Sequence, residues 1–223
     1  DVYKRQPNIG AIHSFSFHNY VTLFTTPELI DMIIGSIALA IGSAVLATIL
    51  GTTGAIGAFY SKKNVNGTMS VLNQIPVVNA DVVTGFSLCI LLVVVFGISK
   101  NTYIPLIIGH TVLSAPFVYL AVVPKLKQMD PSLYEAALDL GATPGYTLIH
   151  IIIPQIASGI ISGFVMAVTL SLDDYFVATY TKPATFDTIS TYVVNATKGS
   201  QTNIKTALWA LSTIIFLIVC LLY

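Results

Sequence analysis

Residues 33–59, IIGSIALAIGSAVLATILGTTGAIGAF, decide the fold of this chain, and the apolar run that contains them begins near Leu29. An α-helix rises 1.5 Å per residue, so about 20 apolar residues cross the hydrocarbon core of a bilayer. The stretch is therefore predicted to be a membrane-spanning helix. Its many Gly, Ser and Ala residues would let neighbouring helices approach closely, which indicates a packed bundle.

The composition of the whole chain agrees with this interpretation. Of the 223 residues, 55% are hydrophobic and only 9% are charged, and the mean hydropathy is +0.82. A soluble domain carries roughly a quarter charged residues, so most of this surface must face lipid. The formal net charge is zero, which gives no indication of nucleic-acid binding. Cys89 and Cys220 lie in apolar runs and are interpreted as small hydrophobic residues.

Four further stretches are long and apolar enough to span a membrane: Met69–Ile98, Ile104–Val123, Ile149–Leu172, and a run from Thr206 that continues to Tyr223. The sequence therefore predicts an all-α, polytopic membrane helical bundle over residues 29–223. Residues 1–28 are predicted to form an N-terminal tail and external segment, of which residues 1–6, DVYKRQ, are interpreted as foreign to the fold. Both ends lack the features of a complete chain, so we expect a longer protein.

Lysine counts give a weak indication of sidedness. With five spans, the first and third loops lie on the same side of the membrane, and together they carry Lys62, Lys63, Lys125 and Lys127. The positive-inside rule slightly favours the cytoplasm for that side.

The third loop, residues 124–150, contains explicit helix-capping signals. Asp130 followed by Pro131 fits the start of a helix, because the carboxylate can accept from free backbone N–H groups and proline suits the first turn. Ser132 with Glu135 offers a competing start as a capping box. Gly141 is predicted to end the short helix in a left-handed conformation.

A second helix is predicted to begin at Thr143-Pro144 and to continue into the fourth span. In the short helix before it, Leu133, Ala136, Ala137 and Leu140 recur at helical spacing and predict a single apolar stripe. Such a stripe alone would also fit an amphipathic connector lying at the membrane surface.

The spacing of this loop resembles the EAA signature, EAA-x3-G-x9-I-x-L-P, of the permeases of binding-protein-dependent ABC importers. The matching residues are Glu135, Ala136, Ala137, Gly141, Ile151 and Pro154, with Ile153 replacing the leucine. The resemblance implies a MetI-like fold, a cytoplasmic loop, and a coupling helix that docks onto a cytoplasmic ABC ATPase dimer. The chain has no phosphate-binding G-x-x-x-x-G-K-[ST] motif. We therefore expect a non-catalytic subunit that binds no cofactor, with ATP and Mg used by the partner ATPase.

An acidic residue lies within the second predicted span. Asp81 follows Asn79 and the helix-breaking Pro76. Placing an acid at membrane depth costs about 2.5–3.5 kcal/mol on insertion scales, so Asp81 is expected to face the bundle interior or a wet cavity. Broken helices at this depth often line a substrate path. The alternatives are a packing pair within the bundle or a position nearer the interface.

Two adjacent acids follow the fourth predicted span. Asp173 and Asp174, with Tyr175 beside them, fit a cation-binding mouth because aromatic faces and carboxylates both attract alkyl-ammonium groups. A solvated pair at a helix end is the alternative interpretation. His110 and His150 are isolated from acidic or cysteine ligands at metal spacing, so we expect structural roles and no metal site.

The segment LSLDDYFVATY at residues 170–180, together with FSFHNYVTLF at 15–24 and GSIALA at 35–40, resembles the permease subunits of spermidine/putrescine importers. That resemblance implies polyamine translocation across the cytoplasmic (inner) membrane of a bacterium. It also implies a second permease subunit, an ATPase dimer and an external polyamine-binding protein as partners. Such permeases have six spans, so five of the six would be present here and the missing one would precede Asn8.

Other functions remain open from the residues alone. The same machinery serves other solutes, such as thiamine, iron or another cation. An ATP-independent carrier or channel would leave the coupling loop unexplained. An intramembrane aspartyl hydrolase using Asp81 with Asp173 or Asp174 would need two carboxyls within hydrogen-bonding reach, whereas the sequence places them at different depths.

Overall fold

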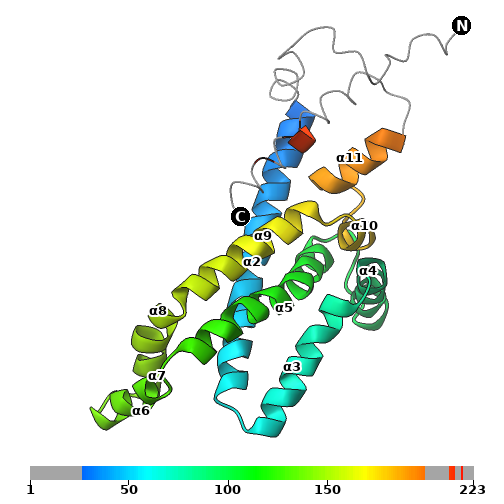
Figure 1. Ribbon diagram of the computed structural model, residues 1–223. Coiled ribbons are helices and arrows are strands. Elements are labelled where there is room, and N and C mark those ends of the chain that lie inside the picture. Colours follow the sequence, from blue (N-terminus) through cyan, green and yellow to red (C-terminus); the bar gives the residue numbers. More distant parts are fainter. Residues whose placement is uncertain (1–26, 199–210, 214–216, 218–223) are drawn as a thin grey trace, which may run out of the picture.

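The computed structural model describes residues 27–198, 211–213 and 217, and every regular element within them is a helix (Figure 1). The elements are α2 (Pro27–Phe59), α3 (Lys63–Val78), α4 (Asp81–Cys89) with a π-helical continuation (Ile90–Val95), α5 (Ile104–Gln128), α6 (Ser132–Asp139), α7 (Pro144–Thr147) with a π-helical continuation (Leu148–Ile152), α8 (Ile153–Gln155), α9 (Ala157–Asp173), α10 (Phe176–Thr181) and α11 (Ile189–Lys198). The all-α prediction is confirmed.

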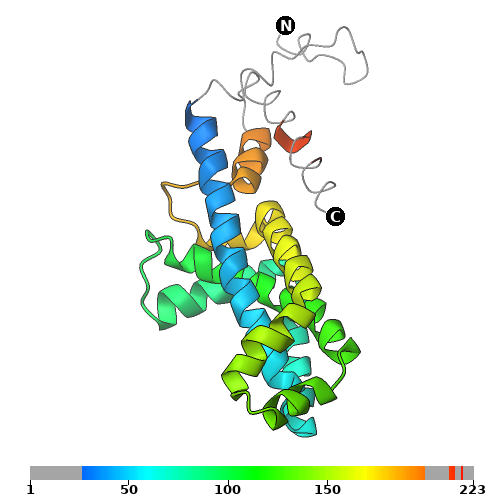
Figure 2. The ribbon, with the colours of Figure 1, turned by 90° about the vertical axis from the view of Figure 1, so that its left-hand side faces the viewer.

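Three helices form the centre of the bundle. α2 runs along most of the molecule, and α5 and α9 pack against it and against each other (Figures 1 and 2). On α2 the buried contacts are alanines, including Ala44, Ala47 and Ala55, whereas α5 contributes the larger Val118 and Leu126. Small residues on one helix facing larger ones on the next allow close packing without a hydrophobic driving force from water.

Two predicted spans are confirmed as single helices. Leu29–Phe59 and Ile104–Gln128 are each long and apolar enough to cross a bilayer. α5 continues past the predicted end at Val123, so that Pro124 lies inside the helix and the third loop begins later than predicted. Large apolar side chains on α2 face outward, among them Ile34 at 60% and Leu50 at 57% exposure, as a lipid-facing surface requires.

The other two described spans are bent. The second was predicted to break at Pro76, whereas the helix that begins at Thr143-Pro144 was predicted to continue unbroken through the fourth. The second span bends by 103° between Asn64–Val78 and Asp81–Val95. Pro76 does not cause the break, because it lies inside α3, and the chain instead becomes extended at Asn79 and Ala80. The fourth span bends by 71° between Pro144–Gln155 and Ala157–Asp173, with the bend at Ile156.

The described part of the fourth loop, up to residue 198, contains two helices that were not predicted. They are α10 and α11, and α10 packs beside α4 (Figure 1). α11 lies near the first part of α2, where the Ile189 backbone N–H donates to the Ser36 hydroxyl over 3.0 Å. The predicted fifth span and residues 1–26 of the predicted tail lie outside the described residues, apart from the few C-terminal positions given above.

Candidate functional site

The short helix α6 is capped as the sequence predicted. Asp130 Oδ1 accepts hydrogen bonds from the Ser132 backbone N–H at 2.9 Å and from the Ser132 hydroxyl at 2.8 Å. Because the serine hydroxyl donates to Asp130, the competing capping box with Glu135 is not the start that forms. Pro131 has helical dihedral angles immediately before α6, in agreement with its predicted place in the first turn.

The end of α6 and the start of α7 also follow their sequence signals. Gly141 has φ +86°, a left-handed conformation that glycine adopts at no steric cost. In this turn the Ala142 N–H donates to the Ala137 carbonyl at 3.0 Å. The Thr143 hydroxyl accepts from the Tyr146 N–H at the start of α7. The predicted unit of helix, glycine turn and second helix is confirmed.

The exposure of α6 divides its predicted apolar stripe. Ala137 is buried and Tyr134 packs its ring against Tyr60 at the end of α2, with centroids 4.9 Å apart. Ala136 is exposed, and the Leu140 side chain is 90% exposed. The predicted stripe therefore differs in exposure along its width: one part holds α6 to the bundle, and the other faces outward.

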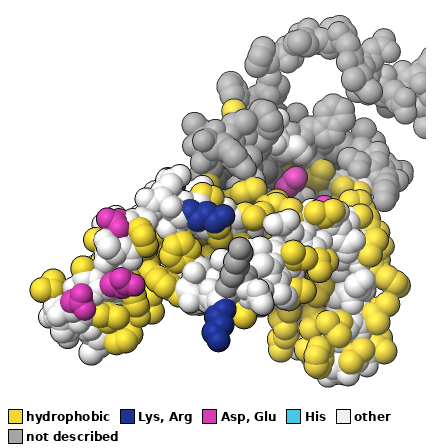
Figure 3. Space-filling view, turned by 60° about the horizontal axis from the view of Figure 1, so that its bottom comes forward, with side chains coloured by type: hydrophobic (Ala, Val, Ile, Leu, Met, Phe, Trp, Pro, Cys, Tyr) yellow, Lys and Arg dark blue, Asp and Glu magenta, His cyan; other side chains and the backbone are white. Residues whose placement is uncertain are grey.

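Acidic side chains surround this outward surface. Asp130, Glu135 and Asp139 are all exposed, and Figure 3 shows acidic side chains gathered at the projecting end of the molecule. An exposed leucine among carboxylates suits contact with a partner better than contact with lipid. We call this outer surface of α6 and its glycine turn, comprising Glu135, Ala136, Leu140 and Gly141, the coupling surface.

The remaining positions of the EAA pattern lie at the bend of the fourth span. Ile151 is partly buried against the main core, while Pro154 is exposed in α8. Between and after them, Ile152 and Ile156 are fully buried. The bend is therefore packed against the bundle and connects the coupling segment directly to α9.

At the far end of α9, the three predicted path acids come together but in different roles. Asp81 begins α4 directly after the break and is exposed, and Asp173 at the end of α9 is also exposed. Asp173 directly precedes Asp174, and α4, which begins at Asp81, packs against α10. The prediction of a mid-helix Asp81 is corrected, because the carboxylate lies in the first turn of a helix, where the helix dipole favours a negative charge.

Asp174 is not an open ligand as predicted. Its Oδ1 accepts from the Val177 N–H at 3.2 Å, and its Oδ2 accepts from the Ala178 N–H at 2.8 Å, so the carboxylate caps α10. Its side chain is only 4% exposed. Of the adjacent pair, only Asp173 faces outward.

Aromatic side chains lie beside these acids. Tyr175, which is partly buried, packs edge-on against Phe176 with centroids 5.2 Å apart. Phe86 of α4 packs edge-on against Tyr180 of α10 at 5.7 Å. The junction of α4, α9 and α10 therefore combines two outward carboxylates with aromatic rings, and we call it the acidic junction.

The structural role predicted for His110 consists of contacts with distant residues that the sequence did not indicate. Its ring is fully buried, with Nδ1 2.8 Å from the Ser171 hydroxyl and Nε2 3.7 Å from Asp174 Oδ2. His150 instead lies at the surface and stacks on Tyr146. Among the described residues no group of three His, Cys, Asp or Glu side chains could hold a metal ion.

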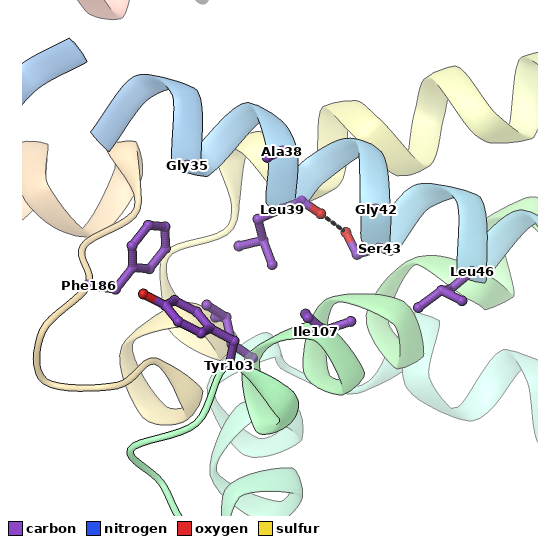
Figure 4. A pocket seen from close by; sticks show the side chains of 10 residues that line it. Gly35, Ala38, Leu39, Gly42, Ser43, Leu46, Tyr103, Ile107 and Phe186 are labelled. Carbon is purple, nitrogen blue, oxygen red and sulfur yellow. Dashed lines mark hydrogen bonds between the residues drawn. The ribbon is translucent and has the colours of Figure 1, made fainter. Parts of the chain in front are cut away.

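A separate cavity of about 430 Å³ lies between α2 and the start of α5 (Figure 4). Phe186, from the segment between α10 and α11, and Tyr103 lie at one end of it, and Leu39, Leu46 and Ile107 face its interior. Its lining contains no carboxylate. It therefore lacks the charge needed to attract a cation, unlike the acidic junction.

Comparison with known proteins decides the family. The sequence family described as "Binding-protein-dependent transport system inner membrane component" matches residues 52–223. The chain belongs to this family of inner-membrane permeases. It is thus the non-catalytic, multi-pass membrane subunit of a binding-protein-dependent ABC importer, in which a partner ATPase hydrolyses ATP.

Curated relatives of the permease include polyamine transporters. It is 31% identical over 192 residues to the spermidine/putrescine permease protein PotC of Haemophilus influenzae, covering 84% of this chain and 72% of that protein. It is 34% identical over 151 residues to the putrescine permease protein PotI of Escherichia coli K12, covering 65% of this chain and 53% of that protein. The chain therefore spans only about half the length of PotI.

Solved ABC transporters share the fold of the permease. A bacterial alginate transporter in complex with its periplasmic protein matches with TM-score 0.70 and 19% identity, over 93% of this chain and 81% of that chain. The methionine transporter MetNI matches with TM-score 0.65 and 13% identity, over 89% and 94% respectively. The MetI-like fold expected from the EAA spacing is confirmed.

Proposed function

We propose that this permease translocates a polyamine, spermidine or putrescine, together with a second permease subunit, a cytoplasmic ATPase dimer and an external polyamine-binding protein. The observation that carries the proposal is the acidic junction in a chain that resembles PotC and PotI. Two outward carboxylates, Asp81 and Asp173, supply negative charge at a break between helices. Polyamines carry ammonium groups separated by alkyl segments, which carboxylates and aromatic faces bind together.

Each acid has a distinct part in this proposal. Asp81 and Asp173 contact the solute along the path, with Tyr175 beside them. Asp174 stays inside the fold and holds α10 in place through its two backbone hydrogen bonds. Asp173 adjoins Asp174 in the chain, and α4, which begins at Asp81, packs against α10, so the three carboxylates belong to one region that a passing cation would stabilise.

The coupling surface supplies the link to ATP in the proposal. Closure of the ATPase dimer moves α6, and the packed bend near Ile151 and Pro154 transmits that movement to α9. α9 ends at Asp173, so the same helix joins the ATPase contact to the acidic junction. The path then changes between inward and outward opening.

Uptake in a polyamine-transport-deficient bacterial strain tests the solute. The permease is expressed with its partner subunits, and uptake of labelled putrescine and spermidine is measured for Asp81→Asn and Asp173→Asn. We expect each to reduce uptake at least about tenfold, since a charge-assisted contact is worth about 1.5–3 kcal/mol. Asp31→Asn, an exposed acid on α2, is the matched control and should keep normal uptake.

Two results would contradict the proposal. Normal uptake by both variants would show that the solute does not contact the carboxylates of the acidic junction. Uptake of labelled thiamine or iron without uptake of either polyamine would reassign the solute while leaving the importer role intact.

Glu135→Ala tests the coupling assignment separately. It should abolish uptake while the purified ATPase subunit keeps its own hydrolysis rate. Unchanged uptake would show that Glu135 on the coupling surface does not transmit closure of the ATPase to the permease.

A further inference from the structure

A buried chain of polar side chains crosses the bundle just below the acidic junction. The Ser43 hydroxyl of α2 lies 3.2 Å from the Ser171 hydroxyl of α9, and Ser171 lies 2.8 Å from Nδ1 of His110 in α5. His110 Nε2 then faces Asp174 Oδ2 at 3.7 Å. Three long helices are thereby connected to the residue that caps α10.

The hydroxyl and imidazole protons of this chain allow two arrangements. The Ser43 hydroxyl donates to the Leu39 carbonyl of its own helix at 2.8 Å, so Ser43 can only accept from Ser171. If Ser171 donates to Ser43, His110 Nδ1 carries the imidazole proton and Nε2 faces Asp174 with a lone pair; if Ser171 donates to Nδ1, Nε2 carries the proton. Only the second arrangement places an N–H rather than a lone pair opposite the Asp174 carboxylate, 3.7 Å away.

Asp174 needs this third donor. Its two carboxylate oxygens accept one backbone N–H each, while its backbone carbonyl accepts from the Ser190 hydroxyl of α11. A carboxylate that is this deeply buried is costly unless further donors compensate for lost water. Among the described residues, His110 is the basic side chain that lies nearest to this carboxylate, with Nε2 3.7 Å from Oδ2.

We propose that His110 is a positioning residue for transport, which acts through Asp174. Its Nε2–H orients the Asp174 carboxylate, and the carboxylate holds α10 against α4 and α5. Asp173 is the neighbour of Asp174, so the same contact sets where that open carboxylate stands relative to Asp81. This role rests on the proposed cation path.

His110 does not itself contact the solute in this proposal. Its side chain is completely enclosed, and its Nδ1 is occupied by Ser171. Nε2 has no partner within hydrogen-bonding distance, although it faces the carboxylate. An unpaired buried polar group destabilises the fold that contains it. Such a cost is understandable if the Nε2–Oδ2 contact shortens to a hydrogen bond in another state of the transport cycle.

Two substitutions of similar polarity separate the roles of the two ring nitrogens. The amide nitrogen of His110→Gln can reach the Nε2 position, whereas the shorter amide of His110→Asn reaches only the Nδ1 position. Both variants are expressed with the partner subunits, and putrescine and spermidine uptake is divided by the amount of ATPase that co-purifies with the permease. The matched control is Ser114→Ala, since Ser114 is buried in the same helix with an unpartnered hydroxyl.

We expect His110→Gln and Ser114→Ala to keep at least about half of normal uptake and His110→Asn to lose at least about fivefold, the effect of one buried hydrogen bond. Equal uptake by the glutamine and asparagine variants would overturn the proposal. If His110→Asn does not assemble, Asp174→Asn replaces it. That change removes the carboxylate charge that Nε2–H faces while keeping one oxygen to accept a backbone N–H of α10, and it should lower uptake at least about fivefold. Normal uptake would overturn the proposal. A difference between Gln and Asn, without any effect of Asp81→Asn or Asp173→Asn, would keep the positioning role and reject the acidic path.

Discussion

Gly85 of α4 lies directly against the backbone of Val177 in α10. A Cβ atom added to Gly85 would stand 2.9 Å from the Val177 Cα and 3.2 Å from its backbone nitrogen. On the α5 side, a Cβ on Gly109 would meet the Val177 side chain at 2.8 Å. The short helix α10 is therefore held between two glycines, and the acidic junction depends on this close approach.

The first prediction concerns this contact. Gly85→Ala should push α4 away from α10, because the obstacle is backbone, and overpacking costs about 1–3 kcal/mol. We expect a lower midpoint of thermal inactivation of the purified complex and reduced uptake. Gly57→Ala in α2 is the control, since nothing lies within 4 Å of its Cβ position. There alanine should be neutral or stabilising, and equal losses for both variants would contradict the packing argument.

The second prediction concerns the glycine turn. Gly141→Val should abolish uptake, because a β-branched residue is strongly strained at the φ of +86° found here. Gly141→Asn should retain part of the uptake, since asparagine tolerates the left-handed region. Gly145→Ala, which has open space around it, serves as control. A valine variant with normal uptake would show that this turn does not orient the coupling surface.

The third prediction concerns the exposed leucine of the coupling surface. Leu140→Ser should weaken binding of the ATPase by at least about tenfold, because it removes an apolar side chain that would be buried at the contact. Binding is measured by the ATPase concentration that half-saturates the purified permease complex. Leu138, partly buried on the same helix, offers the contrast: Leu138→Met should preserve binding. Unaltered affinity of Leu140→Ser would place the ATPase contact elsewhere.

The fourth prediction concerns pH. The backbone N–H and, to a lesser extent, the hydroxyl of Ser132 hold the pKa of the Asp130 carboxyl below its ordinary value of 3.8. A lowered pKa in the folded state means that the cap stabilises α6 at pH values above 3.8 and is lost as the pH falls through the folded value. After correction for the intrinsic pH dependence of exchange, hydrogen exchange of α6 should therefore become faster in the unaltered chain as the pH falls below 3.8. It should not do so in Asp130→Asn, which keeps an accepting oxygen but does not titrate. The same pH profile in both chains would show that the Asp130 carboxylate does not stabilise α6.

The fifth prediction concerns the segment between α10 and α11. Lys182 Nζ lies 2.7 Å from Asp187 Oδ1 and donates to the Phe186 carbonyl at 3.1 Å. These two contacts of Lys182 hold Phe186 beside Gly35 of α2. A double-mutant cycle with Lys182→Gln and Asp187→Asn should give a coupling of about 0.2–1 kcal/mol in thermal stability, since the pair is partly exposed. A coupling of zero would show that the ion pair does not fix the segment.

Local signals made the coupling segment predictable from the sequence. Asp130, Gly141 and Thr143 each act on backbone groups within a few residues, so their chemistry is contained in the sequence that surrounds them. The order of helices and the two straight spans were predictable for a related reason, because apolar length alone determines whether a segment can cross a bilayer.

Contacts between distant segments were not predictable in this way. His110 and Ser171 are 61 residues apart, and nothing near either residue indicates the other. The break in the second span was assigned to Pro76, yet Pro76 lies within α3, where its fixed φ is compatible with a helix, and the chain becomes extended at Asn79 and Ala80. Asp174 was predicted as an open ligand because a capping role needs α10, which gave no signal in the sequence analysis.

The uninterrupted length of α9 has a mechanical consequence. Its 17 residues run from the bend at Ile156 to Asp173, a distance of about 25 Å at 1.5 Å per residue. A rotation of about 10° at the bend would sweep the far end through about 4 Å, a displacement comparable to the shifts that separate the states of many switching proteins. In the proposed mechanism, a small rotation at this bend would therefore become a step at Asp173 large enough to make or break a hydrogen bond.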